Sequence, residues 1–283
     1  MPELPEVETV RAGLVDLLVQ QTISSVKIYQ GKLRYPVPEQ LSSILFQQKV
    51  LSFERRAKYL LLRVATGTVI IHLGMSGSLL WQEKTQAAKK HDHVDLLFEN
   101  GGCLRYHDPR RFGLVLWHPG DQPLQHRLLN KLGPEPLASE FNAQYLYDIS
   151  RTKKRPIKTF LMDSHVVVGV GNIYANEALF QAGIHPECAA GALSFSTCER
   201  LVKIVQDVLR AAIRAGGTTL QDFVNGHGAP GYFQQQLFVY GREGQPCLKC
   251  GTLLIKKRIG QRSAFFCFNC QPQQHCKSSS RER

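Results

Sequence analysis

The sequence predicts an α+β protein in which a β-rich N-terminal part is followed by a helical part and a short C-terminal segment of β structure. Three observations lead to this order. Short β-type runs fill residues 22–117, a helical period dominates beyond residue 136, and paired cysteines occupy the last forty residues. The chain has 283 residues, 43% of them hydrophobic and 20% charged, which suits two ordered domains.

The first expected element is an amphipathic helix over residues 3–19. Val7, Val10, Leu14 and Leu17 recur at spacings of three and four, which places them on one helical face. Carboxylates cluster in the first turn, where the helix dipole favours negative charge.

The segment from Thr22 to Trp117 is predicted to form an antiparallel β-sandwich or barrel. Its apolar runs are short, and several recur about every 8–12 residues with glycine and asparagine turn signals between them. The clearest runs are 58–64, 68–73, 93–98 and 103–106.

The helical part begins after a linker at residues 132–136, where two prolines and a glycine stop regular structure. Residues 197–214 carry its clearest pattern, a single apolar stripe at helical spacing. Ser196 and Glu199 have the spacing of an N-terminal capping box. A Gly-Gly-Thr-Thr run at 216–219 ends this helix and opens a loop.

The formal net charge of +12 favours a polyanion as the partner. The excess is concentrated in residues 241–283, where nine lysines and arginines face two glutamates, a net charge of +7. A solvated basic face explains the charge alone equally well, so the motifs have to decide between the two.

Neither a membrane span nor a secretion signal is visible. No uncharged apolar run is long enough to cross a bilayer, and the chain starts with glutamates instead of the positive start of a signal peptide. We therefore expect a protein that is not secreted, remains in the cytoplasm and keeps its thiols reduced.

Four cysteines near the C-terminus predict one structural zinc ion. Two C-x2-C pairs, separated by sixteen residues, suit two turns that aim four thiolates at a tetrahedral ion, with a β-hairpin between them. The predicted ligands are Cys247, Cys250, Cys267 and Cys270. A segment this short has too little apolar material to fold alone, so the metal would supply the folding energy.

The predicted hairpin is basic. It carries Lys256, Lys257, Arg258 and Arg262, which suggests a finger that contacts nucleic acid. The alternative is a structural clip whose charges are merely solvated.

The second residue is a proline. A small second residue generally allows removal of the initiator methionine, which would leave Pro2 as a free secondary amine. An α-amine ionises below lysine, so more of it is neutral and nucleophilic near pH 7. Such an amine can attack a sugar C1′ and form an iminium, with Glu3 as a neighbouring proton donor. Proline also starts many helices for backbone reasons, and spacing alone leaves that role open.

Six motifs in order along the chain together resemble the formamidopyrimidine-DNA glycosylase (Fpg/Nei) family. They are MPELPEVETV at 1–10, RRAKYLL at 55–61, HLGMSG at 72–77, DPRRFG at 108–113, VGVGNIYANEALF at 168–180 and the terminal cysteine array. The resemblance implies an N-terminal β-sandwich with flanking helices, a helix–two-turn–helix domain and a C-terminal zinc-finger hairpin. The implied domains are 1–131, 132–230 and 238–272, and residues 273–283 are expected to be a disordered basic tail.

The resemblance also implies an activity. It predicts excision of oxidised purines, namely 8-oxoguanine and formamidopyrimidines, and then cleavage of the abasic strand by β,δ-elimination. The implied partner is double-stranded DNA that contains oxidised bases. The protein is expected to act as a monomer at the nucleoid, with zinc and without a redox or nucleotide cofactor.

Four positions match the family's catalytic residues. Pro2 corresponds to the Schiff-base nucleophile and Glu3 to the proton donor of the glycosylase step. Lys58 corresponds to the proton donor of β-elimination, and Arg262 to the finger arginine of δ-elimination.

Further positions match DNA-binding residues of the family. His91, Arg110 and Lys153 correspond to DNA contacts, and Asn172 to an asparagine that grips a phosphate between two helices. Gly169 and Gly171 would let backbone amides approach a phosphate.

A second group corresponds to residues that act at the lesion. Met75, Arg110 and Phe112 correspond to a trio that fills the gap left by a flipped nucleotide. Residues 216–223 match the loop that closes over the flipped base.

Two other functions remain open. The sibling branch that removes oxidised pyrimidines shares the proline, the helices and the finger, but its members typically begin Pro-Glu-Gly-Pro, whereas this chain has Leu4. A catalytically silent zinc-ribbon DNA-binding protein would fit the charge and the finger. It would not require Pro2, Glu3, Lys58 and Arg262 together.

Overall fold

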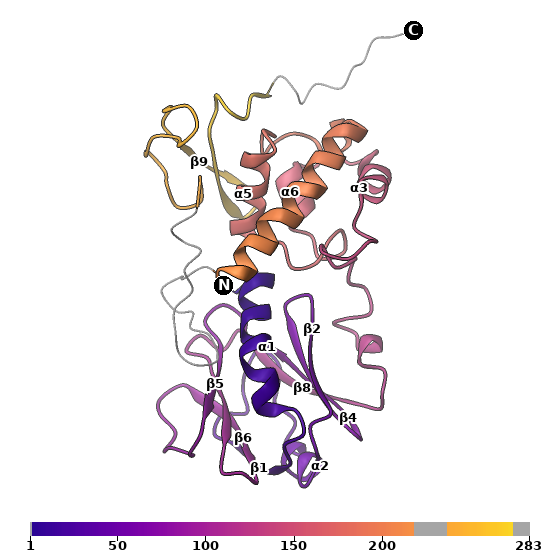
Figure 1. The fold of residues 1–283 in the computed structure, drawn as a ribbon, viewed down its shortest axis with the longest axis vertical. Coiled ribbons are helices and arrows are strands. Elements are labelled where there is room, and N and C mark those ends of the chain that lie inside the picture. The colour runs from indigo at the N-terminus through magenta and orange to yellow at the C-terminus, as the bar shows by residue number, and fades with distance from the viewer. Residues whose placement is uncertain (1, 218–236, 274–283) are drawn as a thin grey trace. The chain divides into compact units, whose positions relative to one another are not determined.

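The computed structural model describes residues 2–217 and 237–273 (Figure 1). The chain divides into two compact units. Unit 1 contains Met1–Lys131 and Ala212–Gln234, and unit 2 contains Leu132–Ala211 and Gln235–Arg283. Of the tail expected at 273–283, residues 274–283 lie outside the described part.

Unit 1 begins with helix α1, Leu4–Leu18. Val7, Val10 and Leu14 are buried as the helical period predicts, whereas Leu17 is only partly buried and Leu18 completes the buried face. The helix starts in a capping box, in which the Glu6 carboxylate accepts a hydrogen bond from the Glu3 N–H at 2.8 Å. Two orphan amides of the first turn are thus satisfied by buried carboxylates rather than by water.

Eight strands of unit 1 form two antiparallel sheets of four strands each. One sheet has the order β1-β6-β7-β5 and the other β2-β3-β4-β8. The strands are β1 Ile23–Ile28, β2 Ser52–Arg56, β3 Tyr59–Val64, β4 Gly67–His72, β5 Ser78–Gln82, β6 Asp92–Phe98, β7 Cys103–His107 and β8 Leu114–Pro119. The short helix α2, Leu41–Leu45, and the 3-10 turn η1, Pro123–Gln125, complete the described elements.

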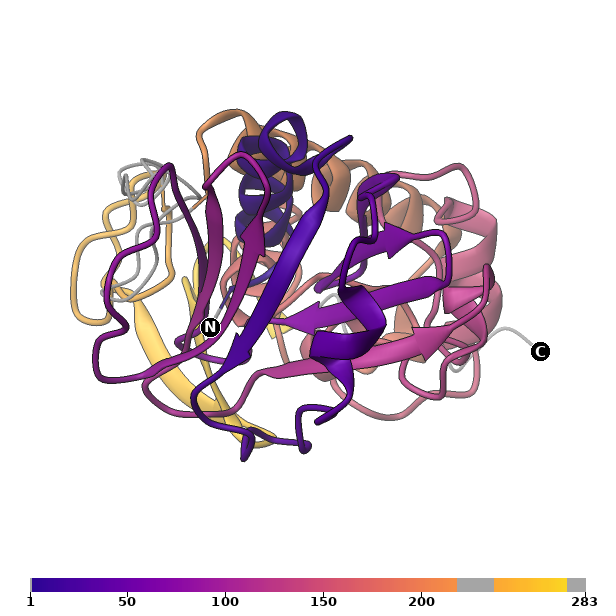
Figure 2. The same cartoon turned by 90° about the horizontal axis from the view of Figure 1, so that it is seen from below.

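The two sheets form a sandwich, which confirms the predicted class (Figures 1 and 2). One buried cluster contains Leu96 and Leu104 of the first sheet, Leu62 and Ile71 of the second, and Leu14 of α1. The helix contacts β2 and β3 of one sheet and β5 of the other. Alternation along the strands thus directs one face of each sheet into a shared core.

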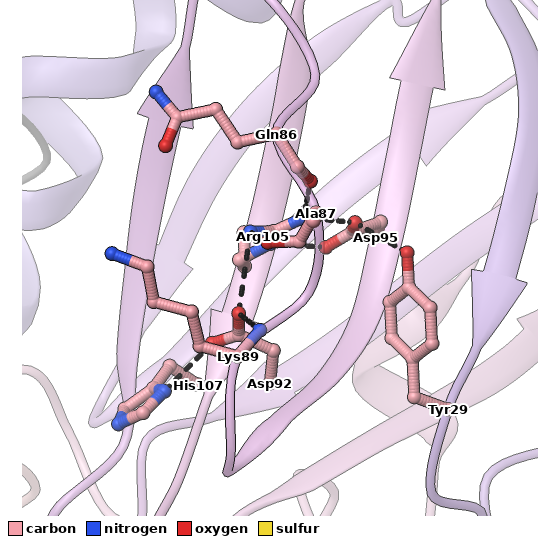
Figure 3. Close-up of polar contacts among 8 residues, drawn as sticks. All are labelled: Tyr29, Gln86, Ala87, Lys89, Asp92, Asp95, Arg105 and His107. Carbon is pink, nitrogen blue, oxygen red and sulfur yellow. Dashed lines mark hydrogen bonds and ion pairs between the residues drawn. The ribbon is translucent and has the colours of Figure 1, made fainter.

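A buried polar cluster lies within the first sheet and the segment that precedes β6 (Figure 3). Arg105 on β7 binds Asp95 on β6 through two hydrogen bonds, of 2.8 and 2.6 Å. Its remaining donors reach Asp92 and the carbonyl oxygens of Gln86 and Ala87. All five N–H groups of the guanidinium are therefore paired, and the hydrogen bond to Asp95 raises the pKa of Arg105 further.

The same cluster also holds the segment of the chain that leads into β6. Asp92 accepts a hydrogen bond from the Lys89 amide at 2.7 Å and contacts Nδ1 of His107 at 2.8 Å. Burial and the hydrogen bond from Tyr29 to Asp95 raise the pKa of that tyrosine. Residues 86–92 are therefore held against the sheet by charge-assisted hydrogen bonds.

Unit 2 contains the helices and a hairpin. The helices are α3 Ala143–Ser150, α4 Ile157–Leu161, α5 Asn172–Gln181 and α6 Phe195–Arg214, with the 3-10 turn η2 Ala190–Ala192; the last turn of α6 belongs to unit 1. Two turns join α4 and α5, which is the helix–two-turn–helix arrangement expected from the family resemblance. Strands β9 Ile255–Ile259 and β10 Arg262–Phe266 form the C-terminal hairpin between the cysteine pairs.

Two local predictions were wrong. Helix α6 begins at Phe195, and its cap is Ser194, whose hydroxyl accepts the Thr197 amide at 3.2 Å; Ser196 lies inside the first turn. The strand expected from Lys58 begins at Tyr59. Both errors have one cause, because more than one nearby residue can serve as a boundary and packing decides between them.

Replacing Asp95 by Asn should lower the free energy of unfolding by about 3–5 kcal/mol, because a buried guanidinium would lose its paired carboxylate. Urea unfolding of the wild type and the variant would measure the loss. Replacing Arg105 by Met in the same chain should recover part of it, since no uncompensated charge then remains. A loss below about 1 kcal/mol would show that the pair is unimportant for stability.

Candidate functional site

The start of the chain is held inside unit 1. Pro2 and Glu3 are buried, and Glu3 is the residue that caps α1. Gly217, at φ +81°, packs on Glu6 so closely that a Cβ there would lie 3.2 Å from its carboxylate oxygen. The segment that leads to residue 218 therefore reaches the first turn of α1. Residues 218–223 of the expected lesion loop lie outside the described residues.

Lys58 lies in a two-residue turn between β2 and β3 and is half-buried. Ala57 in this turn has φ +56°, a conformation that a non-glycine residue adopts only when its surroundings impose it. Arg55 imposes it in part, since its Nη1 donates to the Ala57 carbonyl at 2.9 Å and its Nε donates to Glu8 at 2.8 Å. Glu8 is on α1, so an ion pair connects the helix that starts at Pro2 with the turn that carries Lys58.

His72 is the strand partner of Tyr59 beside that turn, and the two rings lie 4.9 Å apart. Its Nδ1 accepts the Gly74 amide at 2.9 Å, so Nε2 carries the proton of the neutral ring. Burial, and then the charge of Lys58, lower the pKa of His72 to about 4. His72 is therefore neutral near pH 7, because burial and the nearby charge of Lys58 both disfavour its protonated form.

Met75, His91, Arg110 and Phe112 occupy loops of unit 1 outside the strands. The Arg110 guanidinium lies over the Phe112 ring at 5.1 Å, and Phe112 is 47% exposed. His91 has φ +75°. An exposed aromatic ring under a cation suits insertion beside a base, because the ring can stack and the cation can pair with a polyanion.

The positions expected to bind phosphate in unit 2 lie at the helix–two-turn–helix segment and near it. Asn172 is the first residue of α5, and Gly171 is its N-cap. The Asn172 side-chain oxygen is buried and has no hydrogen-bond partner among the described residues. A helix start favours an anion, because its N–H groups and the positive end of the helix dipole point towards it. Lys153 is exposed in the loop before α4.

The four predicted zinc ligands converge, with their ligand atoms all within 4.8 Å of one another. Sγ of Cys250 lies 3.4 Å from that of Cys267, and Sγ of Cys247 lies 3.8 Å from that of Cys270. These separations exceed a disulfide bond and approach the roughly 3.8 Å between thiolates of a tetrahedral zinc site. Hydrogen bonds with the side chains of Thr252 and Asn269 lower the pKa of Cys250, whereas burial raises the pKa of Cys267 and Cys270. A bound cation would favour the thiolate form of all four. The four cysteines therefore fit one structural zinc ion.

Two of the four basic side chains of the finger hairpin form ion pairs with glutamates of unit 2. Lys256 pairs with Glu243 at 3.0 Å, and Lys257 pairs with Glu187 at 2.8 Å. Arg262 is exposed directly after the two-residue turn that follows Ile259. The sequence analysis gave a catalytic role to Arg262 alone and treated the other three cations as a basic surface, whereas Lys256 and Lys257 form ion pairs within unit 2.

Sequence reasoning also missed the residues that hold the finger hairpin. The Nζ atom of the fully buried Lys158 donates to the Ser263 carbonyl at 2.9 Å, next to Arg262. Asn176 accepts the Phe265 amide at 2.8 Å. The sequence analysis gave Lys158 no role, because nothing in its sequence context indicates burial.

The Glu177 carboxylate supports the segment before the finger in a similar way. It accepts three backbone amides of residues 238–240 at 2.9–3.0 Å. Burial raises the pKa of Glu177, and the three amides oppose that effect. A buried carboxylate thus organises the chain that leads into the cysteine pairs.

Within the part of the chain that the structure describes, no helix is long and apolar enough to cross a bilayer.

Three family matches cover most of the chain. Residues 1–115 match the formamidopyrimidine-DNA glycosylase N-terminal domain, and residues 132–224 match the H2TH domain of the same enzymes. Residues 244–273 match the zinc finger found in FPG and IleRS.

Relatives match along the whole length. The formamidopyrimidine-DNA glycosylase of Stutzerimonas stutzeri is 53% identical over 271 residues, which are 96% of this chain and all of the relative. That of Pseudomonas entomophila is 54% identical over the same share.

Solved structures match equally fully. A Lactococcus lactis FPG mutant in complex with DNA that contains Fapy-dG aligns with a TM-score of 0.89 at 34% identity, over 96% of this chain and all of that one. MutM (FPG) of Thermus thermophilus aligns with a TM-score of 0.85 at 36% identity, over 95% and 98%. The chain belongs to the formamidopyrimidine-DNA glycosylase family.

The free energy of unfolding should fall as the pH drops from 6.5 towards 4, because the unfolded chain protonates His72 before the folded one does. The stabilisation is fully present above pH 6.5, and up to about 3 kcal/mol of it is lost near pH 4. Denaturant titrations at several pH values would measure this. His72→Asn keeps an acceptor for the Gly74 amide and should lack that part of the loss. An equal loss in the variant would contradict the assignment.

Removing zinc with a chelator should unfold the finger, because the cysteine segment depends on the metal for its folding energy. Hydrogen exchange should show loss of protection in β9 and β10 while the β-sandwich of unit 1 retains its protection. Affinity for duplex DNA should fall in parallel. Unchanged protection and binding after verified metal loss would exclude a structural role for the ion.

Proposed function

We propose that this protein is a bifunctional DNA glycosylase and abasic-site lyase of base excision repair. It excises 8-oxoguanine and formamidopyrimidines from duplex DNA and then cleaves the abasic strand by β,δ-elimination. The observation that carries the proposal is the arrangement at the start of unit 1, where Pro2 and Glu3 are buried at the start of α1 and the Glu8–Arg55 pair connects this helix to the turn of Lys58.

The reaction begins at the amine of Pro2 after removal of Met1. The neutral amine attacks C1′ of the flipped nucleotide, the bond from C1′ to the base nitrogen breaks, and the base leaves with a proton. Glu3 supplies a proton to the opening sugar. The product is an iminium between Pro2 and C1′, which withdraws electrons from C2′.

Strand cleavage follows from this iminium. Loss of a proton from C2′ expels the 3′ phosphate in β-elimination, and Lys58 serves proton transfer in this step. Arg262 holds the phosphate beside the lesion and supports δ-elimination, for which its exposed position on the hairpin is suitable. Hydrolysis of the iminium then releases Pro2.

DNA binding uses both units. Asn172 with the amides at the start of α5, together with Lys153 and His91, binds phosphates. The group formed by Met75, Arg110 and Phe112 fills the gap left by the flipped nucleotide. Similar structures include a Lactococcus lactis Fpg bound to DNA with an abasic site and a MutM bound to DNA with carbocyclic 8-oxo-G, which supports this partner. The protein would act as a monomer on the nucleoid in the cytoplasm.

Borohydride trapping should yield a covalent adduct at residue 2 on a duplex that carries 8-oxoguanine opposite cytosine. Pro2→Gly should slow excision about tenfold or more, a barrier increase of at least about 1.4 kcal/mol, and leave affinity for the duplex nearly unchanged. Gel analysis and single-turnover kinetics would measure both quantities.

A second duplex that carries an oxidised pyrimidine separates the alternatives. Trapping mainly on that duplex would preserve the chemistry and transfer the protein to the pyrimidine-excising branch. Binding without an adduct on either duplex would indicate a silent DNA-binding protein. A collapse of affinity in Pro2→Gly would show that the proline is structural.

A further inference from the structure

Asp108 is a fully buried carboxylate at the end of β7, where three loops of unit 1 meet. The first loop, residues 73–77, carries Met75. The second, residues 83–91, ends at His91. The third, residues 108–113, carries Arg110 and Phe112. Sequence reasoning assigned no role to Asp108.

The carboxylate of Asp108 joins the first loop to the third. Its Oδ1 accepts the Ser76 hydroxyl at 2.8 Å and the Arg110 amide at 3.2 Å. Its Oδ2 accepts the Gly113 amide at 2.9 Å. It also lies 3.3 Å from the Tyr106 hydroxyl, which shares its one proton between Asp108 and the His72 carbonyl at the same distance. Ser76 Oγ also accepts the Arg110 amide at 3.2 Å, so the two loops share a closed hydrogen-bond ring.

The backbone of Asp108 forms a hydrogen bond to the second loop. Its N–H donates to the His91 carbonyl at 3.0 Å. Its own carbonyl lies 2.7 Å from Nε2 of the buried His93, which must therefore donate. One residue thus contacts all three loops that carry the DNA-contacting positions proposed for unit 1.

The first and third loops also touch through their backbones. Gly74 has φ +63°, and a Cβ on it would lie 2.5 Å from the carbonyl carbon of Phe112. The Phe112 ring, with the Arg110 guanidinium over it, is exposed although the backbone beneath it is anchored. Exposed side chains on an anchored backbone are positioned to contact a binding partner, not to pack in the core.

We propose that Asp108 is a positioning residue that holds Met75, Arg110 and Phe112 as one preformed insertion group. The inference rests on the proposed function and concerns the arrangement of the three loops before DNA binds. Because the loops are ordered before DNA arrives, their ordering does not have to occur while the nucleotide leaves the stack. Asp108 itself touches neither DNA nor the reacting atoms.

A carboxylate is the group that this position requires. Four donors converge on its two oxygens, and an ionised carboxylate accepts at both oxygens without donating. Asparagine has the same shape, but its NH₂ would face the donors of either Ser76 and Arg110 or Gly113 and Tyr106. Asp108→Asn should therefore loosen one loop while leaving the volume of the core unchanged.

The test separates insertion from chemistry. A fluorescent 2-aminopurine in the complementary strand, beside the base opposite 8-oxoguanine, reports unstacking when the insertion group enters. Asp108→Asn should slow this signal and single-turnover excision together by about tenfold or more, since small misplacements of a positioned group are costly. Borohydride trapping on a single-stranded abasic oligonucleotide needs no insertion and should stay within about twofold of the wild type.

Two further variants keep the outcome decisive. Ser76→Ala removes the hydroxyl that links the first and third loops, and it should also slow insertion, by a smaller factor than Asp108→Asn. This variant keeps the proposal testable if Asp108→Asn does not fold. Val26→Ala removes core volume on β1, away from the three loops, and should leave the ratio of insertion to trapping unchanged at a temperature where all variants are folded.

An insertion rate of wild-type size in Asp108→Asn and Ser76→Ala would overturn the proposal. So would an equal loss of single-stranded trapping, because Asp108 would then act through the catalytic end of unit 1. A wild-type protein that cannot be trapped on either substrate would instead refute the proposed function.

Discussion

The hydrogen bond from the Glu3 amide to the buried Glu6 carboxylate is the constraint on which the proposed chemistry depends. A chain terminus normally frays, and a frayed amine cannot be aimed at a sugar carbon. Here the helix begins only two residues after Pro2, and α1 is anchored in the core of the sandwich by its apolar face. The hydrogen bond therefore attaches the start of the chain to a helix that hydrophobic packing anchors in the core.

Buried carboxylates extend this principle through both units. Asp95 holds Arg105 and the segment before β6, Asp108 holds three loops, and Glu177 holds the backbone before the finger. Each accepts several donors, so each removes freedom from a loop that the strands and helices alone would leave mobile. The protein thus combines an apolar sandwich, which supplies stability, with polar clusters, which position functional loops.

The features that were predicted from sequence share a local cause. Four cysteines at two fixed spacings define a tetrahedral site, because each pair needs only its own turn. The apolar stripe of α1 and the spacing of the β runs follow from the repeat of a helix or strand. The cap at Ser194 was missed because Ser196 offered the same chemistry two residues later, and only packing chose between them.

The fold class, the zinc site and the family could all be predicted from sequence, since they follow from residue types at short, fixed separations. The ion pair of Glu8 and Arg55 between α1 and the Lys58 turn could not be predicted in this way, and neither could the contacts of Asp108 with three loops. The ion pairs that Lys256 and Lys257 form within unit 2 are likewise visible only in the folded chain. The physical reason is that a charged side chain chooses its partner by distance in space, and that distance depends on packing between segments far apart in the chain.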